Sequence, residues 1–338
     1  MDTYKVGGLF SGVGGIELGF EKAGFEISWA NEIDLNACKT YRGNFKDHLL
    51  IEDDIWNIID NKFIVKGAPM PPIDVLVGGF PCQAFSIAGY RKGFEDPRGN
   101  LFFAILKFIK HFKPKVILLE NVKNLQSHDN GNTLKRIIKE MHLLGYSFIH
   151  EILNSYKYTA VCQNRERVFM VCFKDEAKYN EAGYFNSNDR ITFNTDNNTP
   201  LSNNFSWPEK INREPKKIST FLERDIDYSI YQYTKEKYPQ YWDMLSDTVI
   251  SKDHVYQLRR VYVRRNESNV CPTLTAGMGL GGHNVPIILD PNNKIRKLTP
   301  RECFSFQGYP KSFKLPDIAN THLYKQAGNS VTVPLITN

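Results

Sequence analysis

A cysteine follows an apolar run at the point where a buried strand is expected to end. Cys82 stands in the sequence Gly-Phe-Pro-Cys-Gln at residues 79–83, directly after the apolar run at 73–77. Ligands of open α/β sheets bind beyond the carboxyl ends of the strands, so this thiol is expected at a functional crevice. A cysteine there is either a small buried apolar side chain or a nucleophile, and Cys82 alone does not decide between the two.

A carboxylate and two guanidinium groups belong to two later strands. Glu120 follows a run of four apolar residues, and partial desolvation at such a position raises a carboxyl pKa and suits proton sharing. Arg165 and Arg167 precede another apolar run, and their spacing lets both point to one face of a sheet. The alternatives are a strand-end cap for Glu120 and a surface stripe of ion pairs for the two arginines.

A glycine-rich turn follows the first expected strand. Its sequence at residues 10–15 is Phe-Ser-Gly-Val-Gly-Gly, which permits a tight turn and a close approach of the backbone to a ligand at a helix N-terminus. Glu32, after the second expected strand, suits ribose hydroxyls, and Asp54, after the third, suits the exocyclic amine of an adenine. The glycine spacing departs from the strict dinucleotide form, and either acid alone could be an ordinary solvated turn residue.

Length and composition limit the class of protein. A chain of 338 residues suits one large domain and a smaller one, and 41% apolar residues are enough for a core without any run long enough to span a membrane. Six dispersed cysteines without a Cys-x-x-Cys pair favour reduced thiols in the cytoplasm over a zinc site or a disulfide framework. The net charge of +6 is compatible with a polyanionic partner but is weak evidence for one. The first residues lack the layout of a secretion signal.

Alternating apolar runs and helical patterns in the first half predict a doubly wound sheet. We expect strands at 5–10, 26–31, 49–51, 75–78, 116–120, 148–153 and 168–173, with helices at 16–23, 35–44, 101–111 and 133–144. The last two strands are separated by a polar connection and are expected to form a hairpin. From about residue 186 the chain is rich in Asn, Ser and Thr, which indicates a boundary. Beyond 255 the pattern is β-like, and residues 259–265 are expected to form one strand.

The chain carries six motifs, in the order Phe-x-Gly-x-Gly-Gly, Pro-Cys-Gln, Glu-Asn-Val, Gln-x-Arg-x-Arg, Arg-Glu-Cys and Gly-Asn-Ser-Val. These motifs, in this order, resemble those of the bacterial cytosine-5 DNA methyltransferase family of restriction–modification systems. The resemblance covers residues 5–175 and then 255 to the end. It implies an α/β fold: a Rossmann-like methyltransferase core dependent on S-adenosylmethionine, with a mixed seven-stranded sheet, and a smaller, mainly β target-recognition domain. The expected division is 1–184 with 320–338 for catalysis, 185–296 for recognition and 297–319 as a hinge.

The resemblance also implies a mechanism. Cys82 would add to carbon 6 of a cytosine flipped out of duplex DNA, which makes carbon 5 nucleophilic. Glu120 would hold ring nitrogen 3 and the exocyclic amine, Arg165 would contact the base oxygen, and Arg167 belongs to the same catalytic set. The methyl donor would be S-adenosyl-L-methionine, with S-adenosyl-L-homocysteine as product and no metal. The expected cofactor-binding residues are Phe10, Gly12, Val13, Gly15, Glu32, Ile33, Asp54, Ile55, Pro81, Asn329, Ser330 and Val331.

The implied partner is double-stranded DNA, bound by a monomer. Methylation would protect that DNA from a cognate restriction endonuclease without required physical contact between the two enzymes. The expected DNA-binding residues are Ser86, Arg91, Lys92, Arg98, Arg260, Tyr262, Arg264, Thr273 and Thr275. The alternatives are a transfer-RNA cytosine-5 methyltransferase, a non-catalytic DNA-binding regulator and, from the glycine turn alone, a nicotinamide oxidoreductase.

Overall fold

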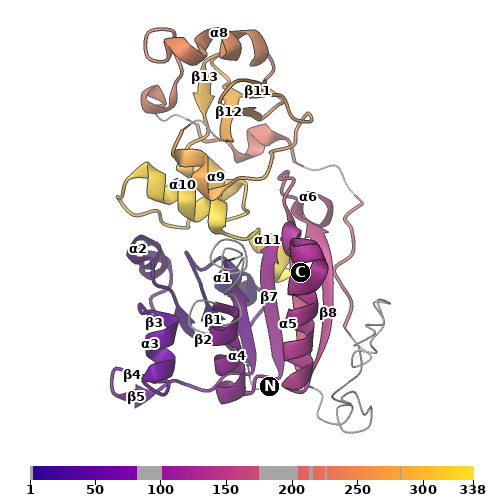
Figure 1. Cartoon of the computed structure of the whole chain (residues 1–338). Helices are drawn as coiled ribbons and strands as arrows, with labels where there is room; N and C mark the ends of the chain where they lie inside the picture. Colours follow the sequence, from indigo (N-terminus) through magenta and orange to yellow (C-terminus); the bar gives the residue numbers. More distant parts are fainter. Residues whose placement is uncertain (1–2, 82–100, 175–204, 213–215, 225–226, 282–283) are drawn as a thin grey trace.

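The structure is a computed structural model that describes residues 3–81, 101–174, 205–212, 216–224, 227–281 and 284–338. Figure 1 shows the two main sheets, a larger one built by the first half of the chain and a smaller one built by residues after 255. Helices α9 (Pro300–Ser305) and α10 (Asn320–Asn329) lie between the two sheets.

The larger sheet has seven strands in the order β3-β2-β1-β6-β7-β9-β8. The strands are β1 (Lys5–Leu9), β2 (Glu26–Asn31), β3 (Leu49–Ile51), β6 (Val75–Gly79), β7 (Val116–Val122), β8 (Tyr146–Asn154) and β9 (Glu166–Lys174). Neighbouring strands are parallel except that β9 runs antiparallel to both β7 and β8. The mixed seven-stranded sheet and the hairpin of its last two strands are therefore confirmed.

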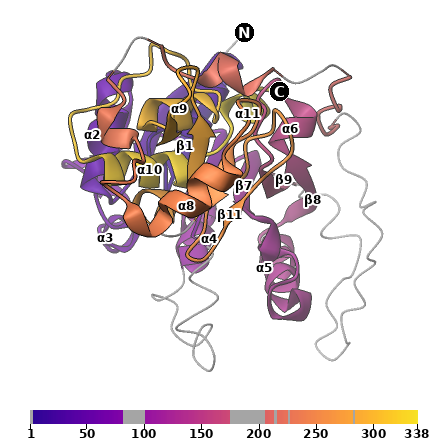
Figure 2. The ribbon, with the colours of Figure 1, turned by 90° about the horizontal axis from the view of Figure 1, so that it is seen from above.

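Helices cover the strands of this sheet and join most of them. They are α1 (Gly15–Lys22), α2 (Leu35–Asn44), α3 (Ile55–Asp60), α4 (Leu101–Phe112), α5 (Asn132–Leu143) and the short α6 (Ser155–Tyr158). Figure 2, seen from above, places α2 and α3 on one side of the molecule and α5 with β8 on the other, as the strand order requires. The sequence did not predict α3 or the small hairpin of β4 (Ile64–Val65) and β5 (Ala68–Pro69), because segments this short show no clear periodicity.

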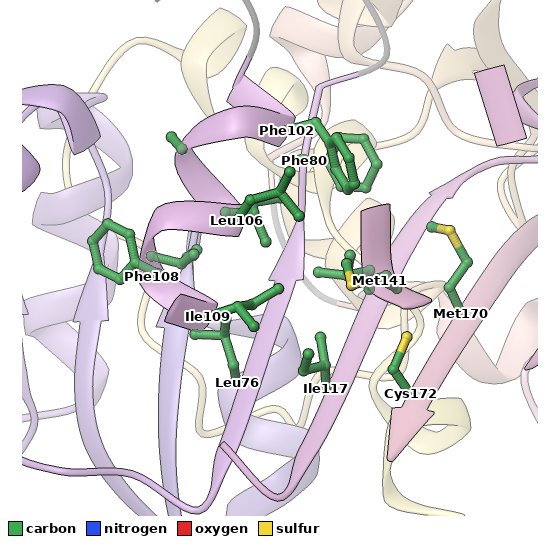
Figure 3. Close-up of a cluster of buried hydrophobic side chains, with 14 of the residues drawn as sticks. Leu76, Phe80, Phe102, Leu106, Phe108, Ile109, Ile117, Met141, Met170 and Cys172 are labelled. Atoms are coloured by element: carbon green, nitrogen blue, oxygen red, sulfur yellow. The ribbon is translucent and has the colours of Figure 1, made fainter. Parts of the chain in front are cut away.

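The core that holds β6 and β7 in place is built largely by α4. Its apolar residues recur at helical spacing, so one face of the helix is buried. Figure 3 shows Ile109 of α4 near Leu76 of β6 and Ile117 of β7, and Phe102 of α4 beside Phe80, which follows β6. Phe102, Ile109, Leu76 and Ile117 are all at most 1% exposed. Each such side chain contributes roughly 1.5–3 kcal/mol of transfer free energy. This packing fixes the two strand ends on which the candidate site stands.

The smaller sheet has four antiparallel strands in the order β11-β10-β12-β13. They are β10 (Tyr256–Leu258), β11 (Val263–Arg264), β12 (Val285–Leu289) and β13 (Ile295–Lys297), and α8 (Pro239–Thr248) packs beside them. The single strand expected at 259–265 is wrong. The N–H of Arg259 donates to the carbonyl of Tyr262 at 2.9 Å and closes a turn between β10 and β11. The alternation of arginines with apolar residues is typical of a strand and led to the wrong prediction, because the chain reverses direction at this point.

The C-terminal residues return to the larger sheet through α11 (Val333–Thr337), which packs against α1. Gly19 of α1 approaches Ile336 so closely that a Cβ on the glycine would lie 2.5 Å from that side chain. In the part of the chain that the structure describes, no helix is long and apolar enough to cross a membrane.

Candidate active site

An ion pair lies at the carboxyl end of β7. Nε of Arg167 is 3.1 Å from Oε1 of Glu120, and both side chains are largely buried, at 15% and 10% exposure. The contact lacks hydrogen-bond geometry, so Oε1 has no hydrogen-bond donor among the described residues. Burial raises the pKa of Glu120, and the nearby charges of Arg167 and Arg165 oppose this rise without cancelling it. The carboxyl group can therefore accept or share a proton with a bound ligand.

The strand β6 ends beside this ion pair, and the chain then continues to the predicted nucleophile. Gly79, the last residue of β6, is paired in register with Glu120. The side-chain amide of Asn121 donates to the carbonyl of Phe80 at 2.9 Å, which fixes the chain just beyond the strand. Pro81 is exposed, and Cys82 is the next residue along the chain. Cys82 itself lies outside the described residues, as do Ser86, Arg91, Lys92 and Arg98, so their roles stay predictions.

Arg165 occupies a different environment from the one expected. Its side chain is only 2% exposed. Nη1 donates to the carbonyl of Leu274 at 3.0 Å, while Nη2 donates to the carbonyl of Gly328 at 3.1 Å and also to that of Ser330. These nitrogens are therefore bonded to backbone oxygens of two other segments. Of the two predicted arginines, Arg167 is the one that contacts Glu120.

Three of the predicted cofactor residues lie beyond the ends of adjacent strands. Gly12 follows β1, Glu32 follows β2 and Asp54 follows β3, and these strands are neighbours in the sheet. The carboxylate of Glu32 accepts the N–H of Gly12 at 2.7 Å and the N–H groups of Ile33 and Asp34 at 2.9 and 2.8 Å. A carboxylate has further lone pairs, so Glu32 can still accept hydroxyl donors. Carboxyl ends of neighbouring parallel strands are where such folds bind ligands.

The surroundings of these residues are open beside the glycine-rich turn. Gly12 has a positive φ of 55°, and a Cβ placed there would meet nothing within 4 Å. Ile33 is 60% exposed, although it is a large apolar side chain. Asp54 caps α3 through Oδ1, which accepts the N–H of Trp56 at 2.7 Å, so Oδ2 can accept from a ligand amine. These features fit the adenosine part of S-adenosylmethionine.

The remaining predicted cofactor residues frame the same turn. Phe10 has a positive φ of 55°, Val13 and Ile55 are buried, and Gly15 packs so closely on Tyr309 that a Cβ would lie 2.5 Å from its hydroxyl oxygen. Gly-Asn-Ser-Val returns here from the end of α10, with Asn329 exposed and Ser330 and Val331 buried. The assignment of all twelve residues to the cofactor stays a prediction.

The described DNA-binding candidates fall into two groups. Arg260 and Tyr262 lie in the exposed turn between β10 and β11, and Arg264 is exposed on β11. Thr273 and Thr275 are half-buried and belong to no strand. The hydroxyl of Thr273 donates to the carbonyl of Asn164 at 2.7 Å. The structure thus separates an exposed basic hairpin from a partly buried threonine segment.

Three side chains at the site had no role assigned from the sequence. Asn121 fixes Phe80, as described above, and fully buried Gln163 donates to the carbonyl of Phe306 at 2.7 Å. Tyr309 shares a hydrogen bond of 2.5 Å with the hydroxyl of Ser330. Asn121 belongs to the Glu-Asn-Val motif and Gln163 to the Gln-x-Arg-x-Arg motif. In both cases the sequence signal for a role was a polar residue next to an apolar run. Tyr309 gave no signal, because its partner is distant in sequence.

Among the described residues, no group of three or more His, Cys, Asp or Glu side chains is arranged to hold a metal ion.

Comparison with known proteins places the chain in a family. The family description "C-5 cytosine-specific DNA methylase" matches residues 4–338. The chain is 48% identical to the Type II methyltransferase M.Bsp6I of Bacillus sp. (strain RFL6), over 98% of this chain and 96% of that protein. It is 35% identical to the Type II methyltransferase M.HhaI of Haemophilus parahaemolyticus, over 97% and 90%. The chain belongs to the C-5 cytosine-specific DNA methylases.

Solved structures show the same fold. The S. pombe Dnmt2 methyltransferase superposes with a TM-score of 0.68 at 19% identity, covering 99% of this chain and 96% of that one. A putative DNA modification methyltransferase of an E. coli prophage gives 0.65 at 21% identity, covering 99% and 97%. At these identities the likeness concerns the fold alone. It agrees with the predicted methyltransferase core, and the family membership makes the chain a DNA cytosine-5-methyltransferase.

Proposed function

We propose that this methyltransferase modifies carbon 5 of a cytosine within a specific short duplex sequence, with S-adenosylmethionine as methyl donor. The observation that carries the proposal is the buried pair of Glu120 and Arg167 at the end of β7, in register with the end of β6 that leads to Cys82. A thiol, a proton-sharing carboxyl group and a cation are thereby assigned to one sheet edge. These groups match what addition to a pyrimidine ring needs.

In this mechanism the thiolate of Cys82 forms a bond to carbon 6 of the flipped base. Glu120 holds ring nitrogen 3 with a shared proton, so the electrons displaced by the thiolate can move toward carbon 5. Arg167 orients Glu120 and can reach the base oxygen, a role we assign to it in place of Arg165 because Arg165 is bonded to backbone carbonyls. Once carbon 5 has been methylated, loss of its proton to solvent re-forms the double bond to carbon 6 and expels the Cys82 thiolate. Flipping the base costs roughly a few kcal/mol of stacking and pairing.

The donor would be held by the residues beyond β1, β2 and β3. Glu32 would accept from ribose hydroxyls, Asp54 from the adenine amine, and Ile33 would cover the adenine ring. When bound, S-adenosylmethionine supplies an electrophilic methyl group. The segment 329–331 would close the remaining side of the site.

The biological setting belongs to the same proposal. Residues 1–184 with 320–338 would form the catalytic domain, 185–296 the recognition domain and 297–319 a hinge, and the presence of two separate sheets supports this division. The enzyme would act in the cytoplasm as a monomer on double-stranded DNA. The Type II names of its relatives support a role in protecting DNA from a cognate endonuclease.

Incubation with tritiated S-adenosylmethionine tests the function. We expect label on duplex DNA, none without nucleic acid and none on transfer RNA. Enzymatic digestion of the product should place the label on 5-methylcytosine. Label on transfer RNA alone would favour the RNA alternative, and binding of DNA without any label would favour a non-catalytic regulator.

The adenine contact can be tested with Asp54→Asn. Asparagine caps a helix as well as aspartate does, so α3 should be retained. The asparagine side-chain NH2 group would face the exocyclic amine of adenine, and two hydrogen-bond donors cannot pair. We therefore expect the dissociation constant for S-adenosylmethionine to rise about tenfold or more. Isothermal titration measures this. Asp74→Asn is the control, because Asp74 contacts Lys5 and Lys115 at the amino ends of the strands, away from the cofactor residues. Equal losses of cofactor affinity in both variants would contradict the assignment.

The exposed hairpin can be tested with Arg260→Ala. A contact from Arg260 to phosphate or guanine predicts a loss of roughly 5–150-fold in duplex affinity. Fluorescence anisotropy at several salt concentrations separates the two kinds of contact, since only the loss of a phosphate contact reduces the salt dependence. Arg136→Ala, which removes an exposed arginine of α5 paired with Glu140, should leave the affinity unchanged. Unaltered binding by Arg260→Ala would exclude the hairpin from the DNA interface.

A further inference from the structure

Three segments distant in sequence meet at the side chain of Arg165. The first is the stretch 162–165 that leads into β9, the second is the threonine segment 271–276, and the third is the end of α10 with residues 328–331. In the proposed function the second segment belongs to DNA recognition and the third to the cofactor site. Arg165 is bonded to both, and its side chain is almost fully buried.

The first two segments are joined along their backbones. The N–H of Asn164 donates to the carbonyl of Cys271 at 2.8 Å, and the N–H of Cys271 donates to the carbonyl of Cys162 at 2.7 Å. Oε1 of Gln163 accepts the N–H of Leu274 at 3.3 Å, while Arg165 donates to the carbonyl of the same residue. Both backbone groups of Leu274, which lies between Thr273 and Thr275, are thus bonded to one motif.

The second and third segments are in direct backbone contact. A Cβ on Gly328 would lie 2.2 Å from the carbonyl carbon of Thr275 and 2.3 Å from the nitrogen of Ala276. A Cβ on Gly279 would lie 2.8 Å from the Tyr324 side chain of α10. Figure 1 shows α10 between the two sheets, so this contact also joins the two parts of the molecule. Displacement of one segment must therefore be transmitted to the other.

We propose that Arg165 is a positioning residue that fixes the cofactor segment 328–331 against the recognition segment 271–276, so that cofactor binding and DNA binding support each other. One guanidinium group reaches carbonyls of both segments through nitrogens held in a rigid plane. A lysine keeps the charge but offers a single nitrogen, which cannot reproduce this geometry. The chemical step remains with Cys82, Glu120 and Arg167.

Arg165→Lys tests this positioning role in the full-length enzyme. The readouts are the dissociation constant for S-adenosylmethionine with and without duplex DNA, the dissociation constant for the duplex, and the single-turnover rate at saturation. We expect the dissociation constants for S-adenosylmethionine and for the duplex each to rise about tenfold. The ratio of the cofactor constant without DNA to that with DNA should move toward one, and the single-turnover rate at saturation should change by less than about tenfold. Gly328→Ala is the second variant, because its Cβ would lie 2.2 Å from the carbonyl carbon of Thr275 and forces the two segments apart, which also displaces the carbonyl that Arg165 bonds. It should give the same pattern if Arg165→Lys does not fold.

Two controls separate positioning from chemistry and from stability. Arg167→Lys should lower the saturated rate and keep the ratio of cofactor constants. Arg296→Lys changes another buried arginine, bonded to Glu302 at 2.8 Å, and should lower the melting temperature without changing that ratio. A fall in the saturated rate of Arg165→Lys with unchanged dissociation constants, or a loss of melting temperature alone, would overturn the proposal.

Because the inference rests on the proposed cofactor and DNA sites, the wild-type enzyme is measured first. Wild-type protein that binds neither S-adenosylmethionine nor duplex DNA would refute the proposed function. Wild-type binding of both, with a ratio of cofactor constants that Arg165→Lys leaves unaltered, would refute the positioning role alone.

Discussion

Cys82→Ser is expected to lower the methylation rate at least about 1000-fold, because a hydroxyl cannot replace the thiolate that adds to carbon 6. Loss of a covalent nucleophile removes the step on which all later steps depend. The affinity for duplex DNA should be retained, since the substitution changes one atom. Single-turnover methylation and fluorescence anisotropy on the same duplex measure the two quantities.

A duplex with 5-fluorocytosine at the target position tests the covalent bond directly. Fluorine replaces the proton that must leave carbon 5, so the enzyme should remain bonded to the DNA when the methyl donor is present. We expect a crosslinked species on a denaturing gel for the wild type and none for Cys82→Ser. Cys172→Ala is the matched control, because Cys172 is fully buried and burial raises the pKa of its thiol, which suppresses the thiolate. A crosslink that persists in Cys82→Ser would contradict the assignment.

The sequence predicted those parts of the site that depend on local pattern. Glu120 could be placed at a strand end because four apolar residues precede it, and the strand β7 indeed includes it. Glu32 and Asp54 could be placed for the same reason, and the sheet order brings their strands together. An apolar run with a polar residue at its end fixes both the strand and the edge at which the side chain stands.

Partners that come from distant segments could not be predicted in this way. Arg165 and Arg167 are equivalent by spacing, yet one is bonded to Leu274 and Gly328 and the other contacts Glu120. Which arginine receives which partner depends on how residues more than a hundred positions later pack. The error at 259–265 has a related cause, because strand patterning does not reveal where a two-stranded ribbon reverses.

Glu120→Gln is expected to lower the methylation rate by about 100- to 10,000-fold and to change its dependence on pH. Glutamine has nearly the shape of glutamate and cannot give a proton to ring nitrogen 3. Burial raises the pKa of Glu120, so the wild-type carboxyl group keeps its proton to a higher pH than an exposed glutamate would. As pH rises through that pKa the proton is lost, and the wild-type rate should fall.

Single-turnover rates from about pH 5 to pH 9 would show this descending limb in the wild type and its absence in Glu120→Gln. Glu166→Gln is the matched control: Glu166 lies in the same motif as Arg167, but its carboxylate is 40% exposed and pairs with Lys123 at 2.9 Å. An exposed pair of this kind contributes little, so the control should keep both the rate and the pH profile. If the descending limb survived in Glu120→Gln, another group would have to supply the proton, and the buried ion pair with Arg167 would serve only to orient the base.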